Sequence, residues 1–253
     1  MMVARRTLDR VLSRAGVLSR AQAAAAVRAG RVAVNGAVAR DPGRWIDQVR
    51  DAVTLDGAPV RPATRRWLML HKPKDCVTTR SDERGRRTIY DLLGAAAQGP
   101  EGFLAPVGRL DRDTSGLLLL TNDHDLADAL LDPTRHVTKT YRVKATTRLD
   151  DAQLAALGRG VQLDDGPTRP ARTARLRDTT TRTLLELRLT EGRNRQVRRM
   201  LVAVGSGVLE LKRTAFGPIE LGDLPSGRWR ELLPAEIEAL WSTAGLEARR
   251  ARP

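Results

Sequence analysis

The 253-residue sequence has one cysteine, Cys76, three histidines, and aromatic side chains at only 3% of its positions. A single cysteine excludes an intrachain disulfide and a cysteine-based metal cage. A lone cysteine in an apolar neighbourhood is usually a small core residue, so we predict that role for Cys76. The sequence contains two tyrosines, and one of them, Tyr141, lies in a strand pattern between Lys139 and Arg142.

Long apolar runs are also missing. No stretch approaches the roughly 20 apolar residues that are needed to cross a bilayer. The N-terminal segment "MMVARRTLDR" is basic, but no apolar segment follows it, so it does not have the pattern of a secretory signal peptide. The sequence therefore predicts a cytoplasmic, soluble protein that does not contact a membrane.

Positive charge is present in excess. The chain has 44 Lys and Arg against 30 Asp and Glu, a net charge of +14. Residues 1–65 carry twelve Arg and five Asp, so half of the net charge falls in about a quarter of the chain. This uneven distribution favours a polyanionic partner, above all a nucleic acid and less often an anionic membrane. The alternative is a solvated basic surface in a protein from a high-arginine proteome.

Residues 1–57 form a self-contained pattern. Two short amphipathic helices are predicted, the first ending at Gly16 and the second capped by Ser19. Alternating valines then flank Asn35-Gly36, which is the strongest short-range signal for a β-hairpin. A further strand pair turns at Asp56-Gly57. Such a module is too small to bury much core, and a binding role suits it.

The remainder reads as a second, larger domain. Residues 58–66 contain two prolines and no periodicity, so we interpret them as a linker. Between residues 67 and 241, strand-like and helical segments alternate without a regular βαβ rhythm, which favours the α+β class. Residues 242–253 are predicted to be a basic, disordered tail. The expected strands are 67–70, 117–121, 140–145, 184–190 and 208–216, and the expected helices are 125–132, 150–158, 193–205 and 234–241.

The segment "GRLDRDTSGLLLLTND", residues 108–123, combines carboxylates, a Ser-Gly turn and four leucines. A calcium loop of the EF-hand type would need a glutamate where Asn122 stands, and leucines occupy positions that should carry ligands. A solvated turn before a buried strand explains much of the pattern. A third reading is that Asp111 is a reactive acid on a rigid element at the mouth of that strand.

The segment 193–205, "RNRQVRRMLVAVG", is predicted to be an amphipathic helix. Its apolar residues recur at helical spacing, and Arg198 lies at the margin of the apolar face. From there Arg198 could reach a carboxylate in planar geometry. Arg195 and Arg199 point away from the face in this helix, so they suit phosphates or a solvated surface.

Several motifs together resemble the pseudouridine synthases of the RsuA/RluB type. They are "HKPKDCVTTRSD", "GRLDRDTSGLLLLTND", "KTYRV", "EGRNRQVRRM" and "LKRTAFGPIELGDLPSGRWREL", in the order of that family. His71, His124 and Arg195 depart from the residues that are usual there, which are Asn, Gly and His. Residues 1–57 resemble the S4 RNA-binding domain of many members. The resemblance implies a catalytic domain built on a mainly antiparallel mixed sheet with flanking helices.

The resemblance also implies roles for individual residues. Asp111 matches the catalytic aspartate, and Tyr141 matches the tyrosine that stacks on the flipped uracil. Arg198 matches the arginine that pairs with the catalytic carboxylate, while Leu211 and Arg109 match supporting residues. From the residues alone, Tyr141 could equally be a core tyrosine with a tied hydroxyl, and Leu211 could be a plain core leucine.

The implied reaction isomerises uridine, so we expect no cofactor and no metal ion. We expect a monomer that binds ribosomal RNA or a pre-ribosomal particle through Arg20, Arg28, Arg31, Arg195 and Arg199. Large-subunit (23S) ribosomal RNA is the expected substrate, and small-subunit (16S) ribosomal RNA is the alternative.

Two other functions stay open at this point. The chain could be a catalytically silent RNA-binding factor in ribosome assembly. It could also be a metal-dependent nuclease that uses Asp111 and Asp113. Which atom Asp111 would attack cannot be read from the sequence.

Overall fold

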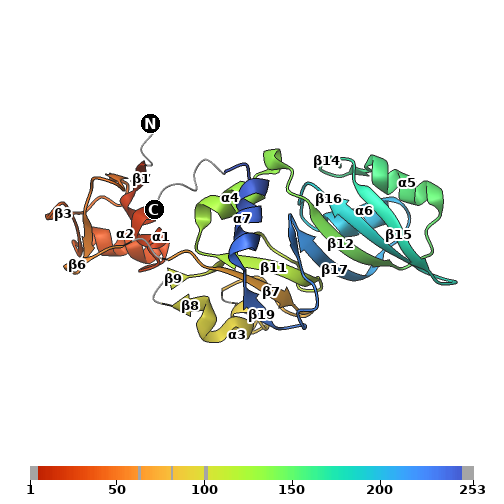
Figure 1. The fold of residues 1–253 in the computed structure, drawn as a ribbon, viewed down its shortest axis with the longest axis horizontal. Helices are drawn as coiled ribbons and strands as arrows, with labels where there is room; N and C mark the ends of the chain where they lie inside the picture. The colour runs from red at the N-terminus through yellow and green to blue at the C-terminus, as the bar shows by residue number, and fades with distance from the viewer. Residues whose placement is uncertain (1–4, 62–63, 81, 100–101, 247–253) are drawn as a thin grey trace. The chain divides into compact units, whose positions relative to one another are not determined.

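The computed structural model describes residues 5–61, 64–80, 82–99 and 102–246 (Figure 1). The chain divides into two compact units. The first is built from the N-terminal part up to Arg66, together with Ala95–Ala105 and Thr121–His124, and the second contains the rest. Within the described ranges, no helix has both the length and the apolar character that a membrane span requires.

After the short strand β1 (Arg5–Thr7), the first unit has two helices, α1 (Leu8–Arg14) and α2 (Arg20–Arg28). Ser19 caps α2 as predicted: its hydroxyl accepts the Gln22 backbone N–H, and the Gln22 side chain accepts the Ser19 N–H. The apolar faces of both helices enter a core with Val32, Val34 and Ile46. The small module therefore has a hydrophobic core of its own.

A four-stranded sheet completes this core, with strand order β3-β2-β5-β6. Asn35 and Gly36 have positive φ angles of 54° and 82°, which is the geometry of a type I′ turn and confirms the predicted hairpin. Asp56 and Gly57 form a second such turn. The strands of the first unit are β1 (Arg5–Thr7), β2 (Val32–Val34), β3 (Ala37–Ala39), β4 (Trp45–Asp47), β5 (Val53–Leu55), β6 (Ala58–Pro59), β8 (Gln98–Gly99) and β9 (Gly102–Phe103).

The second unit is built on a nine-stranded sheet whose main path has the order β15-β16-β12-β17-β11-β7-β19. Strand β17 pairs in parallel with β11 and antiparallel with β12, so the sheet is mixed and mainly antiparallel as predicted. The strands are β7 (Trp67–Lys72), β10 (Ala105–Pro106), β11 (Ser115–Thr121), β12 (Lys139–Ala145), β15 (Arg172–Asp178), β16 (Thr183–Leu189), β17 (Val208–Phe216), β18 (Ile219–Glu220) and β19 (Trp229–Glu231). A separate hairpin contains β13 (Gln162–Leu163) and β14 (Gly166–Pro167).

Helices cover this sheet in two groups and define two cores. Helices α4 (His124–Leu131) and α7 (Pro234–Thr243) pack on β7 and β11. Helices α5 (Asp151–Arg159) and α6 (Gln196–Ala203) pack on β12 and β16 (Figure 1). Strand β17 contributes Phe216 to the first core and Leu211 to the second, so the two cores meet along β17. Shorter elements are α3 (Ile89–Leu93), η1 (Gly94–Ala97) and η2 (Pro133–Arg135).

The C-terminal segment corrects one expectation. Helix α7 extends to Thr243, and Ala244 and Leu246 are buried in the core with α4. Their apolar side chains continue the buried face of the helix, so residues 242–246 belong to the folded unit and not to a tail. Residues 247–253 of the predicted tail lie outside the described residues.

Candidate active site

Asp111 lies on a turn between β10 and β11. The Thr114 backbone N–H donates to the Asp111 carbonyl at 3.1 Å, which closes the turn just before the buried strand. The Thr78 hydroxyl donates to the carbonyl of Leu110 at 2.8 Å and anchors the residue before Asp111. The carboxylate therefore stands at the end of a rigid strand, as the sequence predicted.

Lys72, the last residue of β7, hydrogen-bonds to the same turn. Its side chain is completely buried, and its ammonium donates to the carbonyls of Pro73, Arg112 and Thr114 at 3.1, 3.2 and 2.9 Å. Burial lowers the pKa of Lys72 to about 8, while the nearby Cys76 thiol and the Asp111 and Asp113 carboxylates act to raise it. Lys72 thus ties the middle and the C-terminal end of the turn to strand β7.

Gly116 allows β11 and β17 to approach closely at the site. It has φ +111°, and a Cβ placed there would lie 2.1 Å from the carbonyl oxygen of Arg213. Any side chain would push the strands apart or bend one of them. One position earlier, the Ser115 hydroxyl donates to the Leu211 carbonyl at 3.4 Å. This close pairing brings β17 beside the Asp111 turn.

A small cavity of about 80 Å³ is lined by four of the five residues predicted for the active site, all except Arg198. Asp111, Tyr141 and Leu211 line it together with Arg109 and Arg195. Leu189, Val197 and Leu110 supply apolar surface around them. The structure therefore brings together five of the residues that the sequence singled out, although they come from different strands and loops.

Tyr141 is in contact with a buried arginine, Arg213, on the neighbouring strand. On β12 it is opposite Arg213 of β17, and the Tyr141 side chain interacts electrostatically with the Arg213 guanidinium. Burial lowers the pKa of Arg213, and the interaction with Tyr141 opposes that shift. Arg213 also donates to the Leu117 carbonyl at 2.8 Å and stacks over Phe216. Sequence analysis missed Arg213 because a charged residue in a strand gives no sign of complete burial.

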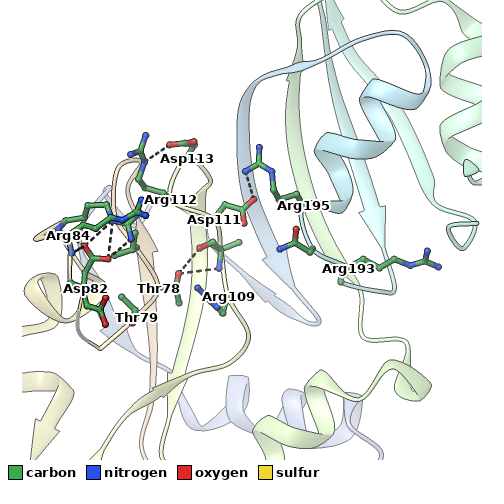
Figure 2. A pocket seen from close by; sticks show the side chains of 16 residues that line it. Thr78, Thr79, Asp82, Arg84, Arg109, Asp111, Arg112, Asp113, Arg193 and Arg195 are labelled. Atoms are coloured by element: carbon green, nitrogen blue, oxygen red, sulfur yellow. Dashed lines mark hydrogen bonds and ion pairs between the residues drawn. The ribbon is translucent and has the colours of Figure 1, made fainter. Parts of the chain in front are cut away.

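A larger cavity of about 800 Å³ opens on the other side of Asp111 (Figure 2). Its volume lies in the range of ligand sites, about 300–1,000 Å³. The walls carry an excess of positive charge. Asp113 in this wall has a lowered pKa, chiefly because Arg112 donates to it. The basic residues that line the cavity are Arg84, Arg86, Arg109, Arg112, Arg193 and Arg195.

The arginine that pairs with Asp111 is not the predicted one. Arg195 Nη1 lies 3.6 Å from Asp111 Oδ2 (Figure 2). Arg198 instead donates to the carbonyls of Asp113 and Val208 at 3.3 and 3.4 Å, and no ion pair between Arg198 and Asp111 occurs in the described ranges. The physical reason is that α6 begins at Gln196, so Arg195 is not on the helix from which its direction was predicted.

Arg199 and Arg193 are committed to protein partners. Arg199 donates to both carboxylate oxygens of Asp165 at 2.8 and 3.1 Å, at the tip of the β13–β14 hairpin. Arg193 donates to the carbonyls of Gly166 and Pro167 in the same hairpin. Arg193 ties the hairpin to the segment before α6, and Arg199 ties it to α6 itself. This pairing makes Arg199 a poorer phosphate ligand than the sequence suggested.

The three arginines of the first unit that were predicted to bind RNA differ in their protein partners. Arg20 donates to Asp9 at 2.9 Å. Burial acts to raise the pKa of Asp9, but hydrogen bonds from Thr7, Arg20 and the Arg10 N–H outweigh it and leave that pKa lowered. Arg31 pairs with Asp56 through two nitrogens. Arg28 is exposed and forms no ion pair with a described residue, so it is the most available of the three for a phosphate.

His71 stabilises the segment that follows β18. Its ring Nδ1 lies 2.6 Å from the Leu224 carbonyl, and its backbone bonds to Gly227 and Arg228. Burial lowers the pKa of His71, and the charge of Lys212 acts in the same direction.

In the part of the chain that the structure describes, no group of three or more His, Cys, Asp and Glu side chains is arranged to hold a metal ion.

Comparison with protein families gives two matches along the chain. The model described as RNA pseudouridylate synthase matches residues 66–203, and the S4 domain model matches residues 6–47. The first match covers more than half of the chain and contains Asp111, Tyr141 and Arg195.

Individual relatives extend the match over nearly the full length. The ribosomal large subunit pseudouridine synthase B of Bacillus subtilis is 37% identical over 239 residues, which are 94% of this chain and 96% of that protein. The protein of the same name from Shigella flexneri is 39% identical over 239 residues, 92% of this chain and 81% of that protein. The crystal structure of a pseudouridylate synthase aligns with 92% of this chain, and the alignment includes 99% of the residues of that structure. The two chains are 32% identical in sequence, and the TM-score is 0.66.

Proposed function

The chain belongs to the RNA pseudouridine synthase family, and from that premise we propose that it converts a specific uridine of large-subunit (23S) ribosomal RNA to pseudouridine, with Asp111 as the catalytic residue. The observation that carries the proposal is the convergence of Asp111, Tyr141 and Leu211 on one small cavity. Membership of the family supports the isomerase activity on RNA. The geometry of the cavity supports the roles proposed for Asp111, Tyr141 and Leu211.

The reaction breaks the bond between N1 of uracil and C1′ of the ribose and forms a bond from C5 to C1′. The hydrogen on C5 is lost and N1 gains one, so nothing is added to the nucleotide overall. A single carboxylate suits this chemistry, either as a nucleophile or as a base. Asp111 has this access because one third of its side chain is exposed at the mouth of the cavity. Arg195 supplies a positive charge beside it.

The base has to leave its stack to reach Asp111, as in other enzymes that act on nucleobases. Tyr141 offers an aromatic surface for the flipped uracil, and Leu211 offers an apolar one. The Arg213 guanidinium interacts with the Tyr141 side chain and helps to fix the position of the ring. The tyrosine is thereby also placed to assist removal of the C5 proton.

RNA affinity is supplied by two regions in this proposal. The S4-like module presents the exposed Arg28, and the larger cavity beside Asp111 presents an arginine-rich wall. Phosphate contacts of this kind give affinity and register without reading sequence. The two relatives named for the large ribosomal subunit support large-subunit RNA as the substrate.

The catalytic assignment is tested by a matched pair of variants. Asp111→Asn and Asp113→Asn each remove one carboxylate from the same turn, but only Asp111 lines the small cavity. With ribosomal RNA as substrate and pseudouridine separated from uridine by liquid chromatography of the digested nucleosides, we expect Asp111→Asn to lose activity and Asp113→Asn to retain most of it. Equal activity of the wild type and Asp111→Asn would refute the assignment.

The substrate is tested separately from the chemistry. Purified large-subunit and small-subunit RNAs that lack the modification are offered to the enzyme, each as free RNA and as the assembled particle. Pseudouridine is then mapped at single-nucleotide resolution. We expect one modified uridine in the large-subunit RNA. A product found only in the small-subunit RNA would overturn the substrate proposal and leave the isomerase activity intact.

A further inference from the structure

Arg195 lies where the two cavities meet. It lines both of them, as do Asp111 and Arg109, and its guanidinium is directed at the Asp111 carboxylate (Figure 2). The side chain is half exposed, and the 3.6 Å separation of Nη1 and Oδ2 is longer than a hydrogen bond. An exposed ion pair of this kind contributes only about 0–1 kcal/mol, so Arg195 can exchange Asp111 for another anion at little cost.

The backbone at Arg195 is unusual and explains its direction. Arg195 is the N-cap of α6 with φ +47° and ψ +32°, in the left-handed region that non-glycine residues rarely adopt. Its side chain caps no helical N–H group. A left-handed arginine costs about 1–3 kcal/mol and persists only where the surrounding structure enforces it. The conformation turns the side chain out of the helical direction and toward Asp111.

A network of hydrogen bonds enforces this conformation. The Gln196 side chain accepts the Arg193 N–H at 3.0 Å and donates to Glu191. Glu191 also accepts the Arg169 N–H at 3.1 Å. Glu191 and Gln196 are both buried, so the segment from Glu191 to Gln196 is held at both ends. The hydrogen bonds on both sides of Arg195 therefore hold it in its left-handed conformation.

Among the basic groups of the larger cavity that the structure describes, only Arg195 forms an ion pair with Asp111. Arg86 is bound to Asp82, Arg112 to Asp113, and Arg193 to main-chain carbonyls. Arg195 instead touches the catalytic carboxylate and opens into a cavity with an excess of positive charge. A cavity of that character accepts the phosphates of an RNA strand.

We propose that Arg195 couples RNA binding to catalysis: it pairs with Asp111 in the free enzyme and passes to a backbone phosphate beside the target uridine when RNA is seated. Asp111 is then released toward the reacting nucleotide only in the bound state. This inference rests on the proposed function, because it requires Asp111 to act on a uridine. It assigns Arg195 as a positioning residue with two successive partners.

The test uses the full-length protein and the RNA found to be modified. Arg195→Ala, Arg195→His and the wild type are compared by single-turnover rate at saturating RNA and by the slope of log affinity against log salt concentration. Arg188→Ala is the matched control, because it removes one arginine whose side chain pairs with Glu186 on strand β16. Circular dichroism verifies that each variant is folded.

We expect Arg195→Ala to lower the single-turnover rate roughly ten- to a hundred-fold, as misplacement of a reacting group does. The salt slope should fall by about 0.7, the value for one contact to a single strand. Below about pH 6.5, where an ordinary histidine becomes charged, the single-turnover rate of Arg195→His should rise above that of Arg195→Ala. Arg188→Ala should change the rate less than two-fold.

The outcomes separate this inference from the proposed function. If the wild type forms no pseudouridine in any ribosomal RNA, the proposed function fails, and the salt slope alone still tests the phosphate contact. If the wild type is active and Arg195→Ala matches it in rate and slope, only the role of Arg195 fails. A change in the slope without a change in the rate, or the reverse, would also overturn the coupling.

Discussion

Lys72 allows a quantitative test of how the turn that carries Asp111 is held. Its ammonium is completely buried at the end of β7, where burial lowers its pKa to about 8 from the ordinary value of 10.5. The native state therefore releases this proton near pH 8, whereas the unfolded chain keeps it until about pH 10.5. Between these values the unfolded state binds more protons, so the free energy of unfolding rises with pH.

The size of the effect follows from the two pKa values. At pH 9.5 the native lysine is 1.5 pH units above its pKa, and the unfolded lysine is still charged. With about 1.36 kcal/mol per unit, Lys72 adds about 2 kcal/mol to the stability between pH 7 and pH 9.5. Lys72→Met removes the titrating group and should lose this increase. Lys74→Met is the matched control because Lys74 is exposed two residues away.

Urea unfolding of the wild type and both variants at pH 7.0, 8.2 and 9.5 measures the prediction. All three proteins carry Cys76→Ala, so that the buried thiol beside Lys72 does not titrate in the same window. The difference between wild type and Lys72→Met should grow by at least about 2 kcal/mol, because Cys76→Ala removes a group that raises the pKa of Lys72. The difference for Lys74→Met should stay constant. A difference that stays flat or shrinks with rising pH would refute the burial argument.

The same substitution should also affect turnover. Methionine cannot donate to the carbonyls of Arg112 and Thr114, and each buried carbonyl left unpaired costs about 1–3 kcal/mol. The turn that carries Asp111 should relax, which lowers kcat and leaves KM nearly unchanged. Full turnover in a folded Lys72→Met enzyme would show that the lysine does not position the turn.

Three further predictions concern other parts of the chain. Gly116→Ala should destabilise the protein by about 3 kcal/mol or more in thermal unfolding, whereas Gly85→Ala, with open space around its Cβ position, should cost less. Arg198→Lys should lose most of the single-turnover activity and keep a native circular dichroism spectrum, because lysine has no planar fork to bridge the carbonyls of Asp113 and Val208. Removal of residues 1–60 should weaken RNA binding and flatten its salt dependence, and an unfolded remainder would contradict independent folding of the second unit.

Much of the architecture could be predicted because local patterns agree with the final packing. Val32 and Val34 before Asn35-Gly36 and the apolar runs of β7 and β11 are buried as their composition indicated. Strand β15 was missed because its sequence "RTARLRD" is mostly exposed at the edge of the sheet and carries little apolar signal. Helix α3 was also missed, although Thr88 and Asp91 form a capping box that could have revealed it.

The site was predictable where a residue's position follows from its own strand. Asp111 before β11 and Tyr141 on β12 are placed by elements that the pattern identified correctly. Arg195 was misplaced because the helix was extended to residue 193, and a left-handed residue at a helix N-terminus leaves no trace in hydrophobic periodicity. Arg213 and Lys72 were overlooked because their burial depends on strands distant in sequence.

The treatment of positive charge shows what a count of arginines cannot resolve. A net charge of +14 indicates a polyanionic partner, but it does not say which side chains meet that partner. Arg20, Arg31 and Arg199 each have a carboxylate within hydrogen-bonding distance, so a phosphate would have to displace that carboxylate. Arg28 has no such competitor among the described residues, and Arg195 has only Asp111, whose carboxylate is 3.6 Å away and is the proposed catalytic group. RNA affinity should therefore depend most on the arginines with the weakest internal partners, and at Arg195 the weakness of that partner links affinity to turnover.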